Sequence, residues 1–177
     1  MCIVLLFIFF ILILFIIILN TIRTLSVKIE ESKADLEVYL IKRYDILTES
    51  LKVAKKYMEH ETDIMINITK IRKGMDLNET TKVLEEQESF MNKFYATAEN
   101  YPDLYSNELF KNLQAQITDT NEHLSAAKRL YNSNVSVFNQ YIVQFPVTLV
   151  AKIVNEKQRE FLKDENIEEK KDFKLDL

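Results

Sequence analysis

No glycine or proline occurs between Met1 and Lys73, and the first residue of this kind is Gly74. Glycine and proline are the residue types least compatible with a helix interior. Their absence allows a single helix to run through this whole stretch, to about Lys73. The complete chain of 177 residues holds one Gly, two Pro and no Trp, and it is rich in Lys, Glu, Leu and Ile. Such a composition favours long helices over sheets, and we expect an all-α protein.

The chain starts with an uninterrupted apolar run from Cys2 to Leu19. As a helix, eighteen residues span about 27 Å, close to the roughly 30 Å of a bilayer's hydrocarbon core. A cleaved signal peptide, the alternative, would show a basic start, a shorter core and a small-residue cleavage site. Residues 1–22 are therefore predicted to be a retained transmembrane anchor. The single cysteine excludes an intramolecular disulfide, and Cys2 is interpreted as an inert thiol in the membrane.

Charges near the anchor predict its orientation. No Lys or Arg precedes the apolar run, whereas basic residues follow it on the other side. These are Arg23, Lys28, Lys33, Lys42 and Arg43. By the positive-inside rule we expect a single-pass protein of the cell membrane, with its N-terminus outside and its body in the cytoplasm.

The first helix carries an apolar seam beyond the anchor, at steps of three and four residues. The seam positions are Leu40, Tyr44, Leu47, Leu51, Ala54, Met58, Glu61, Met65, Ile68, Arg72 and Met75. Nine of these eleven are apolar or aromatic, which is typical of a helix in a coiled coil or bundle. Gly74 is predicted to cap this helix at its C-terminus.

Asp76, three residues before Glu79, predicts a capping box at the start of a second helix. That helix is expected to end near Asn100, because the residue before Pro102 is driven out of the helical region. Its apolar face holds Val83, Phe90, Phe94 and Ala98, widened by Met91 and Tyr95.

A third helix is expected from a cap at Ser106 to about Gln144. Its seam is Phe110, Leu113, Ile117, Thr120, Leu124, Ala127, Tyr131, Asn134, Phe138, Tyr141 and Phe145. Pro146 stops or kinks it, and a short helix over Leu149 to Val154 is expected to follow. The predicted fold is thus a transmembrane helix followed by an antiparallel bundle of three long helices and a short C-terminal helix. The predicted division is an anchor over 1–22, a bundle over 23–154 and a charged tail over 155–177.

Several ordered motifs resemble the LemA family. In the first helix they are Val38-x-Leu40-x-Lys42-Arg43-Tyr44-Asp45, Tyr57 and His60-Glu61. Further along they are Tyr101-Pro102-Asp103-Leu104, Asn107, Phe110, Ala126-Ala127-Lys128-Arg129-x-Tyr131-Asn132, Val135, Phe138-Asn139, Ile142, Phe145-Pro146-x-x-Leu149-x-Ala151 and Lys174-Leu175-Asp176-Leu177. The resemblance implies a bacterial-type, single-pass membrane protein with a helical-bundle body. It implies no established biochemical activity and suggests an adaptor role.

Twelve of these residues are our candidates for an interaction or structural motif. They are Arg43, Asp45, Tyr101, Pro102, Asp103, Asn107, Arg129, Tyr131, Asn132, Asn139, Phe145 and Pro146. Tyr131, Phe138 and Phe145 are expected in the core, and Ala126 and Ala127 are expected to allow close helix approach. Asn107, Asn132 and Asn139 either hydrogen-bond between helices or bind a partner, and we favour hydrogen bonding.

No residue pattern in the chain indicates catalysis. His60, with Glu59, Glu61 and Asp63, is the best candidate for a metal or acid–base site. However, neither His60 nor His123 has the Glu-x-x-His spacing of a di-iron bundle, and no second His completes a zinc helix. With one glycine, neither a nucleophile elbow nor a phosphate-binding loop is available. We therefore expect no enzyme, cofactor, metal or small-molecule substrate.

The charge pattern gives no sign of nucleic-acid binding, because the net charge is −4. The basic pairs Lys42-Arg43, Lys55-Lys56 and Lys128-Arg129 are interpreted as solvated helix faces. The favoured function is a membrane-anchored scaffold or adaptor for protein partners. A self-assembling coiled-coil structural protein is the main alternative, and a carboxylate-metal bundle enzyme is the weaker one.

Overall fold

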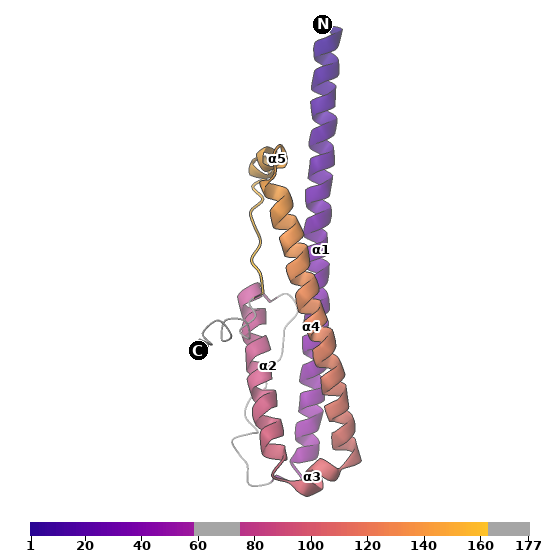
Figure 1. Ribbon diagram of the computed structural model, residues 1–177, viewed down its shortest axis with the longest axis vertical. Helices are drawn as coiled ribbons and strands as arrows, with labels where there is room; N and C mark the ends of the chain where they lie inside the picture. Colours follow the sequence, from indigo (N-terminus) through magenta and orange to yellow (C-terminus); the bar gives the residue numbers. More distant parts are fainter. Residues whose placement is uncertain (59–74, 163–177) are drawn as a thin grey trace, which may run out of the picture. The chain divides into compact units, whose positions relative to one another are not determined.

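The computed structural model describes residues 1–58 and 75–162 (Figure 1). Its helices are α1 (Cys2–Ala54), α2 (Leu77–Ala98), α3 (Pro102–Ser106), α4 (Glu108–Val143) and α5 (Val147–Ile153). No strand occurs within these described ranges, and the expected all-α bundle with a long apolar N-terminal helix is confirmed.

The chain divides into two compact units, which we describe separately. Unit 1 comprises Met1–Ala34 and Lys128–Phe161. Unit 2 comprises Asp35–Ala127 and Leu162–Leu177.

The buried side of α1 follows a seam with three- and four-residue steps. Its buried residues include Ile22, Ile29, Ser32, Leu36, Leu40, Arg43, Leu47, Ser50 and Ala54. Leu40, Leu47, Ala54 and Met58 of the predicted seam are buried, but Tyr44 and Leu51 are only half-buried. The polar residues Arg43 and Ser50 are buried in their place. The seam predicted from the sequence did not include these two polar core positions.

The prediction that this helix continues to about Lys73 is wrong, because α1 ends at Ala54. The next amides, of Lys56 and Tyr57, bond to the carbonyls of Val53 and Ala54 three residues back, which tightens and turns the chain. The turn lets Met58 pack into the core. The predicted Gly74 cap and the seam residues from Glu61 to Arg72 lie outside the described residues.

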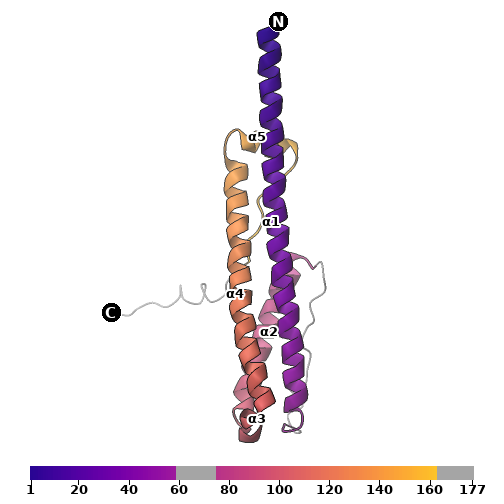
Figure 2. The same ribbon diagram turned by 90° about the vertical axis from the view of Figure 1, so that its right-hand side faces the viewer.

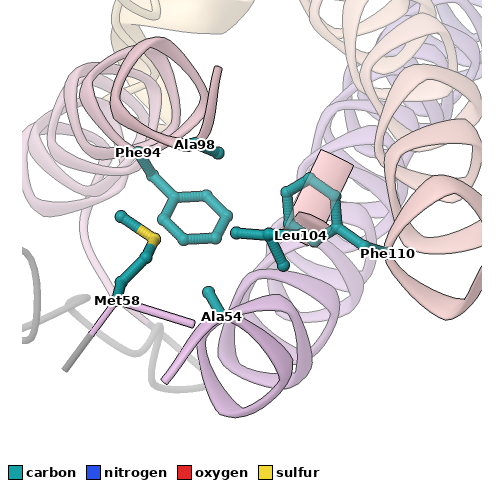
Figure 3. Close-up of a cluster of buried hydrophobic side chains, with 6 residues drawn as sticks. All are labelled: Ala54, Met58, Phe94, Ala98, Leu104 and Phe110. Atoms are coloured by element: carbon teal, nitrogen blue, oxygen red, sulfur yellow. The ribbon is translucent and has the colours of Figure 1, made fainter. Parts of the chain in front are cut away.

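In unit 2, the ends of α1 and α2 meet the start of α4 around one apolar cluster (Figure 3). The cluster consists of Ala54, Met58, Phe94, Ala98, Leu104 and Phe110. Figure 3 shows the Phe94 ring directed from α2 into the space beside Met58 and Leu104. The rings of Phe94 and Phe110 meet edge to face, with centroids 6.0 Å apart. Since the last turns of α1 and α2 share this cluster with the first turn of α4, α4 is antiparallel to both, whereas α1 and α2 are parallel to each other.

The start of α2 agrees with the predicted capping box. The Asp76 carboxylate accepts the amide of Glu79 at 2.8 Å, and the Glu79 carboxylate accepts the amide of Asp76 at 3.1 Å. Two amides that would otherwise lack helical partners are satisfied in this way. The helix ends at Ala98, close to the predicted Asn100.

The connection between α2 and α4 differs from the prediction. Pro102 begins the short helix α3, where its missing N–H costs nothing. Ser106 is the last residue of α3 and is not the cap of the next helix. The cap is Asn107, whose side-chain oxygen accepts the amide of Phe110 at 3.1 Å; Asn is a favoured cap residue.

The seam of α4 is buried nearly as predicted, from Phe110 to Phe138. Its buried residues are Phe110, Leu113, Ile117, Thr120, Leu124, Ala127, Tyr131, Val135, Phe138 and Ile142. Asn134 and Tyr141 are half-buried, and Val135 and Ile142 occupy the core instead. Of the two alanines expected at close approach, Ala127 is buried and Ala126 is exposed.

In unit 1, the expectation that Phe145 belongs to the core is wrong, because its side chain is 81% exposed. The helical spacing that predicted its burial no longer applies, since α4 ends at Val143. Pro146 then caps α5, which starts two residues earlier than predicted and buries Val147, Val150 and Ala151. The predicted tail from residue 155 is non-helical as far as Leu162, and the remainder lies outside the described residues.

Candidate functional site

A buried guanidinium joins the helices of unit 2. Arg43 of α1 is 2% exposed. Its Nε donates to Gln87 Oε1 at 2.9 Å, and its Nη2 donates to the Leu84 carbonyl at 3.1 Å, both on α2. Its Nη1 reaches Asn121 Oδ1 of α4 at 3.4 Å. One side chain therefore links α1 to two other helices.

Gln87 completes this network from the other side. Its side chain is fully buried, and its Nε2 donates back to the Leu40 carbonyl of α1 at 3.4 Å. Asn121 Nδ2 lies 3.3 Å from the Met91 sulfur. A charged donor with several fixed acceptors is the arrangement that makes a buried charge tolerable.

Burial nevertheless lowers the pKa of this guanidinium. Desolvation lowers the pKa of Arg43 from its ordinary value to about 10, and the nearby negative charge of Glu88 opposes that shift. The side chain remains cationic at neutral pH. The interpretation of Lys42-Arg43 as a solvated pair is therefore wrong for Arg43. It is correct for Lys42, whose exposed amine pairs with Asp119 at 3.4 Å.

Tyr95 adds a second polar group to the interior of unit 2. Its hydroxyl is buried and makes no hydrogen bond of standard geometry within the described residues. Desolvation raises the pKa of this phenol, and the neighbouring Ser50 hydroxyl acts in the opposite direction. The Ser50 hydroxyl itself donates to the Ile46 carbonyl at 2.9 Å.

Asn107 fastens the turn between α3 and α4 to the end of α1. While its oxygen caps α4, its Nδ2 donates to the Tyr57 hydroxyl at 3.2 Å. Leu104 of α3 is fully buried beneath this turn. The residues from Tyr101 to Asn107 thus close the end of the bundle, with Pro102 and Asp103 on the surface.

In unit 1, Asn139 holds the segment that follows α5. Its Nδ2 donates to the Arg159 carbonyl at 2.9 Å, and its Oδ1 accepts the Arg159 amide at 2.8 Å. The Tyr131 hydroxyl donates to the Glu160 carbonyl at 3.2 Å. All three bonds are made to the backbone of the segment. Asn139 and Tyr131 therefore bind it along α4, and we call this arrangement the tail clamp.

The Arg159 side chain covers the tail clamp. Its guanidinium carbon lies 5.6 Å from the centroid of the Phe138 ring, within cation–π range. Its Nη2 contacts Glu156 at 3.2 Å and Ser26 at 3.5 Å. Desolvation and the negative charge of Glu30 raise the pKa of the Tyr131 phenol, and the positive charge of Arg159 lowers it.

The twelve candidate residues are divided between the two units. Arg43, Asp45, Tyr101, Pro102, Asp103 and Asn107 belong to unit 2, and Arg129, Tyr131, Asn132, Asn139, Phe145 and Pro146 belong to unit 1. Asp45, Pro102, Asp103, Arg129 and Phe145 are exposed, whereas Tyr101, Asn132 and Pro146 are half-buried. Asn107 and Asn139 make the hydrogen bonds described above, and a partner role for them stays a prediction.

Sequence reasoning missed Gln87 and Arg159. Gln87 had a usable signal, because it lies four residues after Val83 and three before Phe90, on the apolar face of α2. A polar residue in such a row is either a buried hydrogen-bonding group or a break in the pattern. No comparable signal marked Arg159, whose contacts are set by the path of a non-helical segment.

Within residues 1–58 and 75–162, no group of three or more His, Cys, Asp or Glu residues is placed to hold a metal ion. His123 stacks on Tyr39 with ring centroids 5.2 Å apart, and its Nε2 lies 3.5 Å from Asp119. His60 and its acidic neighbours lie outside the described residues.

The N-terminal part of α1 is long and apolar enough to cross a membrane. Its most apolar window of eighteen residues has a mean hydropathy of 3.8 and is almost entirely uncovered by the rest of the chain. Such a helix suggests membrane anchoring.

These features define a class: a helical-bundle protein whose first helix begins with a membrane-anchor-like apolar run. The family model for the LemA family matches residues 32–176, which is most of the chain. The chain belongs to the LemA family, as its motifs suggested. No curated protein matches the sequence.

Proposed function

We propose that this protein is a single-pass cell-membrane protein whose helical body acts by binding, as a scaffold or adaptor for protein partners. The observation that carries the proposal is the continuity of α1. One helix from Cys2 to Ala54 contains both the apolar run and the residues that build the bundle core. A helix without a break supports a body held close to the bilayer.

The surface of unit 2 supports recognition of a protein. Pro102 and Asp103 project at the closed end of the bundle while Leu104 anchors the turn from within. A rigidly held surface turn is a common recognition element. Asn107, at the end of the turn, bonds to Phe110 and Tyr57, so little ordering entropy opposes binding.

The proposal assigns no enzymatic activity to the chain. Its polar clusters are used within the fold: the Arg43 network joins three helices, and the tail clamp binds the chain's own backbone. Purified full-length protein with a specific catalytic turnover would overturn this assignment.

Partner binding is tested by replacing Asp103 with a photo-crosslinking amino acid and irradiating intact membranes. One recurrent crosslinked protein is expected, and Lys82, an exposed residue of α2, provides a matched control position. Crosslinks only between copies of this chain would favour the self-assembling structural protein instead.

The proposal places the N-terminus outside and the body in the cytoplasm. Because Cys2 is the only cysteine, a Cys2→Ser chain carrying Asp103→Cys has a single thiol in the body. A membrane-impermeant maleimide should leave this thiol unlabelled in intact cells and label it after permeabilisation. Labelling in intact cells would reverse the orientation.

A further inference from the structure

The end of unit 1 that contains α5 exposes apolar side chains outside the predicted anchor. Phe145 precedes α5 and is 81% exposed, and Leu149 and Ile153 are 53% and 72% exposed. Leu149 and Ile153 are four residues apart on α5, so they share one face of the helix. The opposite face packs inward through Val147 and Val150. We call Phe145, Leu149 and Ile153 the α5 foot.

A short helix that is apolar on both faces is unusual at a surface open to water. The inward face accounts for its packing, and the outward face has no covering element within the described residues. Exposed apolar patches of this kind mark sites of interaction with another apolar phase. The question is what covers the α5 foot.

Its position points to the bilayer. Figures 1 and 2 both show α5 beside α1, with the N-terminal part of α1 continuing past it. Burial on α1 agrees with this view: side chains as far as Ile17 are mostly exposed, and the first buried one is Ile18. The α5 foot therefore lies where α1 leaves the packed part of unit 1 and its uncovered apolar run begins.

Charge supports the same assignment. From Leu130 to Asn155 the only charged side chain is Lys152, which is exposed on α5. On α1 the first charged side chains are Arg23 and Lys28, and the first acidic one is Glu30. Charged side chains near the α5 foot are thus few: beyond Lys152 the next is Glu156, whose carboxylate is paired with Arg159 at 3.2 Å. Such a surface suits contact with acyl chains flanked by anionic headgroups.

We propose that the α5 foot inserts into the lipid surface on the body side of the membrane, beside the point where α1 enters the bilayer. This inference rests on the proposed membrane anchor and adds a second contact with the bilayer. Lys152 lies next to Ile153 and meets the phosphate headgroups. Two contacts fix the tilt and rotation of the anchored unit, which a single spanning helix leaves free.

The chain has no tryptophan, so a single introduced Trp reports its own surroundings. Full-length Phe145→Trp protein is reconstituted into vesicles of phosphatidylcholine and phosphatidylglycerol. Their acyl chains carry bromine, a fluorescence quencher, either near the carbonyl end or near the methyl end. An interfacial residue lies about 5–10 Å deep, so the fluorescence of the introduced tryptophan should shift to the blue. Lipid brominated near the carbonyl end should quench it more strongly.

Two matched variants separate this inference from the anchor itself. In Ile11→Trp protein, lipid brominated near the methyl end should quench more strongly, because residue 11 lies in the apolar run. Leu109→Trp, at an exposed apolar position in the first turn of α4, should be unquenched by either lipid. If Ile11→Trp is quenched and Phe145→Trp is not, the α5 foot is refuted and the anchor stands. If Ile11→Trp is unquenched, the anchor itself fails.

A third variant guards against chance proximity to the bilayer. Adding Ile153→Asp to Phe145→Trp should abolish most of the quenching, while the far-ultraviolet circular dichroism of the helices stays unchanged. A second copy or another protein covering the foot would give the Phe145→Trp variant a blue-shifted emission that neither brominated lipid quenches. That result would overturn the proposal.

Discussion

The Arg43–Gln87 pair makes opposite predictions for the removal of each partner. Gln87→Leu leaves a buried cation with one acceptor fewer, and an unsatisfied donor that is charged costs about 3 kcal/mol. Arg43→Met leaves the Gln87 oxygen without its charged donor, at about 1–3 kcal/mol. However, Arg43→Met also removes the desolvation cost that lowers the pKa of Arg43 to about 10. Removing this cost stabilises the variant by roughly 3 kcal/mol. Arg43→Met should therefore destabilise much less than Gln87→Leu.

The double variant Arg43→Met with Gln87→Leu should be close to the parent in stability, because an apolar pair replaces a buried polar one. Urea unfolding of the full-length chain in detergent micelles, followed by far-ultraviolet circular dichroism, measures all three. Lys42→Met, which removes only an exposed ion pair, is the control and should change stability by less than about 1 kcal/mol. The reasoning is refuted if Arg43→Met costs as much as Gln87→Leu, or if the two effects simply add.

Three further predictions concern other polar groups. In an alkaline titration followed by tyrosinate absorbance, Tyr95 and Tyr131 should ionise at a higher pH than a tyrosine in an unfolded chain. Both folded-state pKa values lie above the unfolded value of 10. The contribution of the two tyrosines to stability is therefore complete below pH 10 and is lost as the pH rises above it. Tyr131→Phe should reduce this loss of stability at alkaline pH. Asn139→Ala should open the tail clamp, seen as faster tryptic cleavage after Arg159 in folded protein; an unchanged rate would contradict the role of the clamp. Asn107→Ala should cost about 0.5–2 kcal/mol in urea unfolding through loss of the α4 cap, with Ser106→Ala as a near-neutral control.

The long-range pattern of the sequence predicted the helices well, because it reflects burial over many residues. The α4 seam from Phe110 to Phe138 and the capping box at Asp76 follow from spacing alone. Both signals are local or periodic, and neither depends on how the chain closes on itself.

Chain ends and polar core positions were predicted less well, because they depend on contacts between distant residues. The end of α1 at Ala54 reflects the packing of Met58 and the bond from Asn107 to Tyr57, not a local helix breaker. Likewise, Arg43 and Lys42 are adjacent in sequence but about 100° apart around the helix. Only the acceptors on α2 and α4 decide which of the two is buried.

The Arg43 network also fixes how α1 is aligned with α2. Leu36, Leu40 and Leu47 are identical side chains that can pack in one another's places. Apolar packing alone would therefore tolerate a shift of α1 by one heptad along α2. Such a slip would place Leu36 or Ser50 opposite Gln87 and leave the Arg43 guanidinium without its carbonyl acceptors. A single buried charge thereby turns a repetitive seam into one with a unique register.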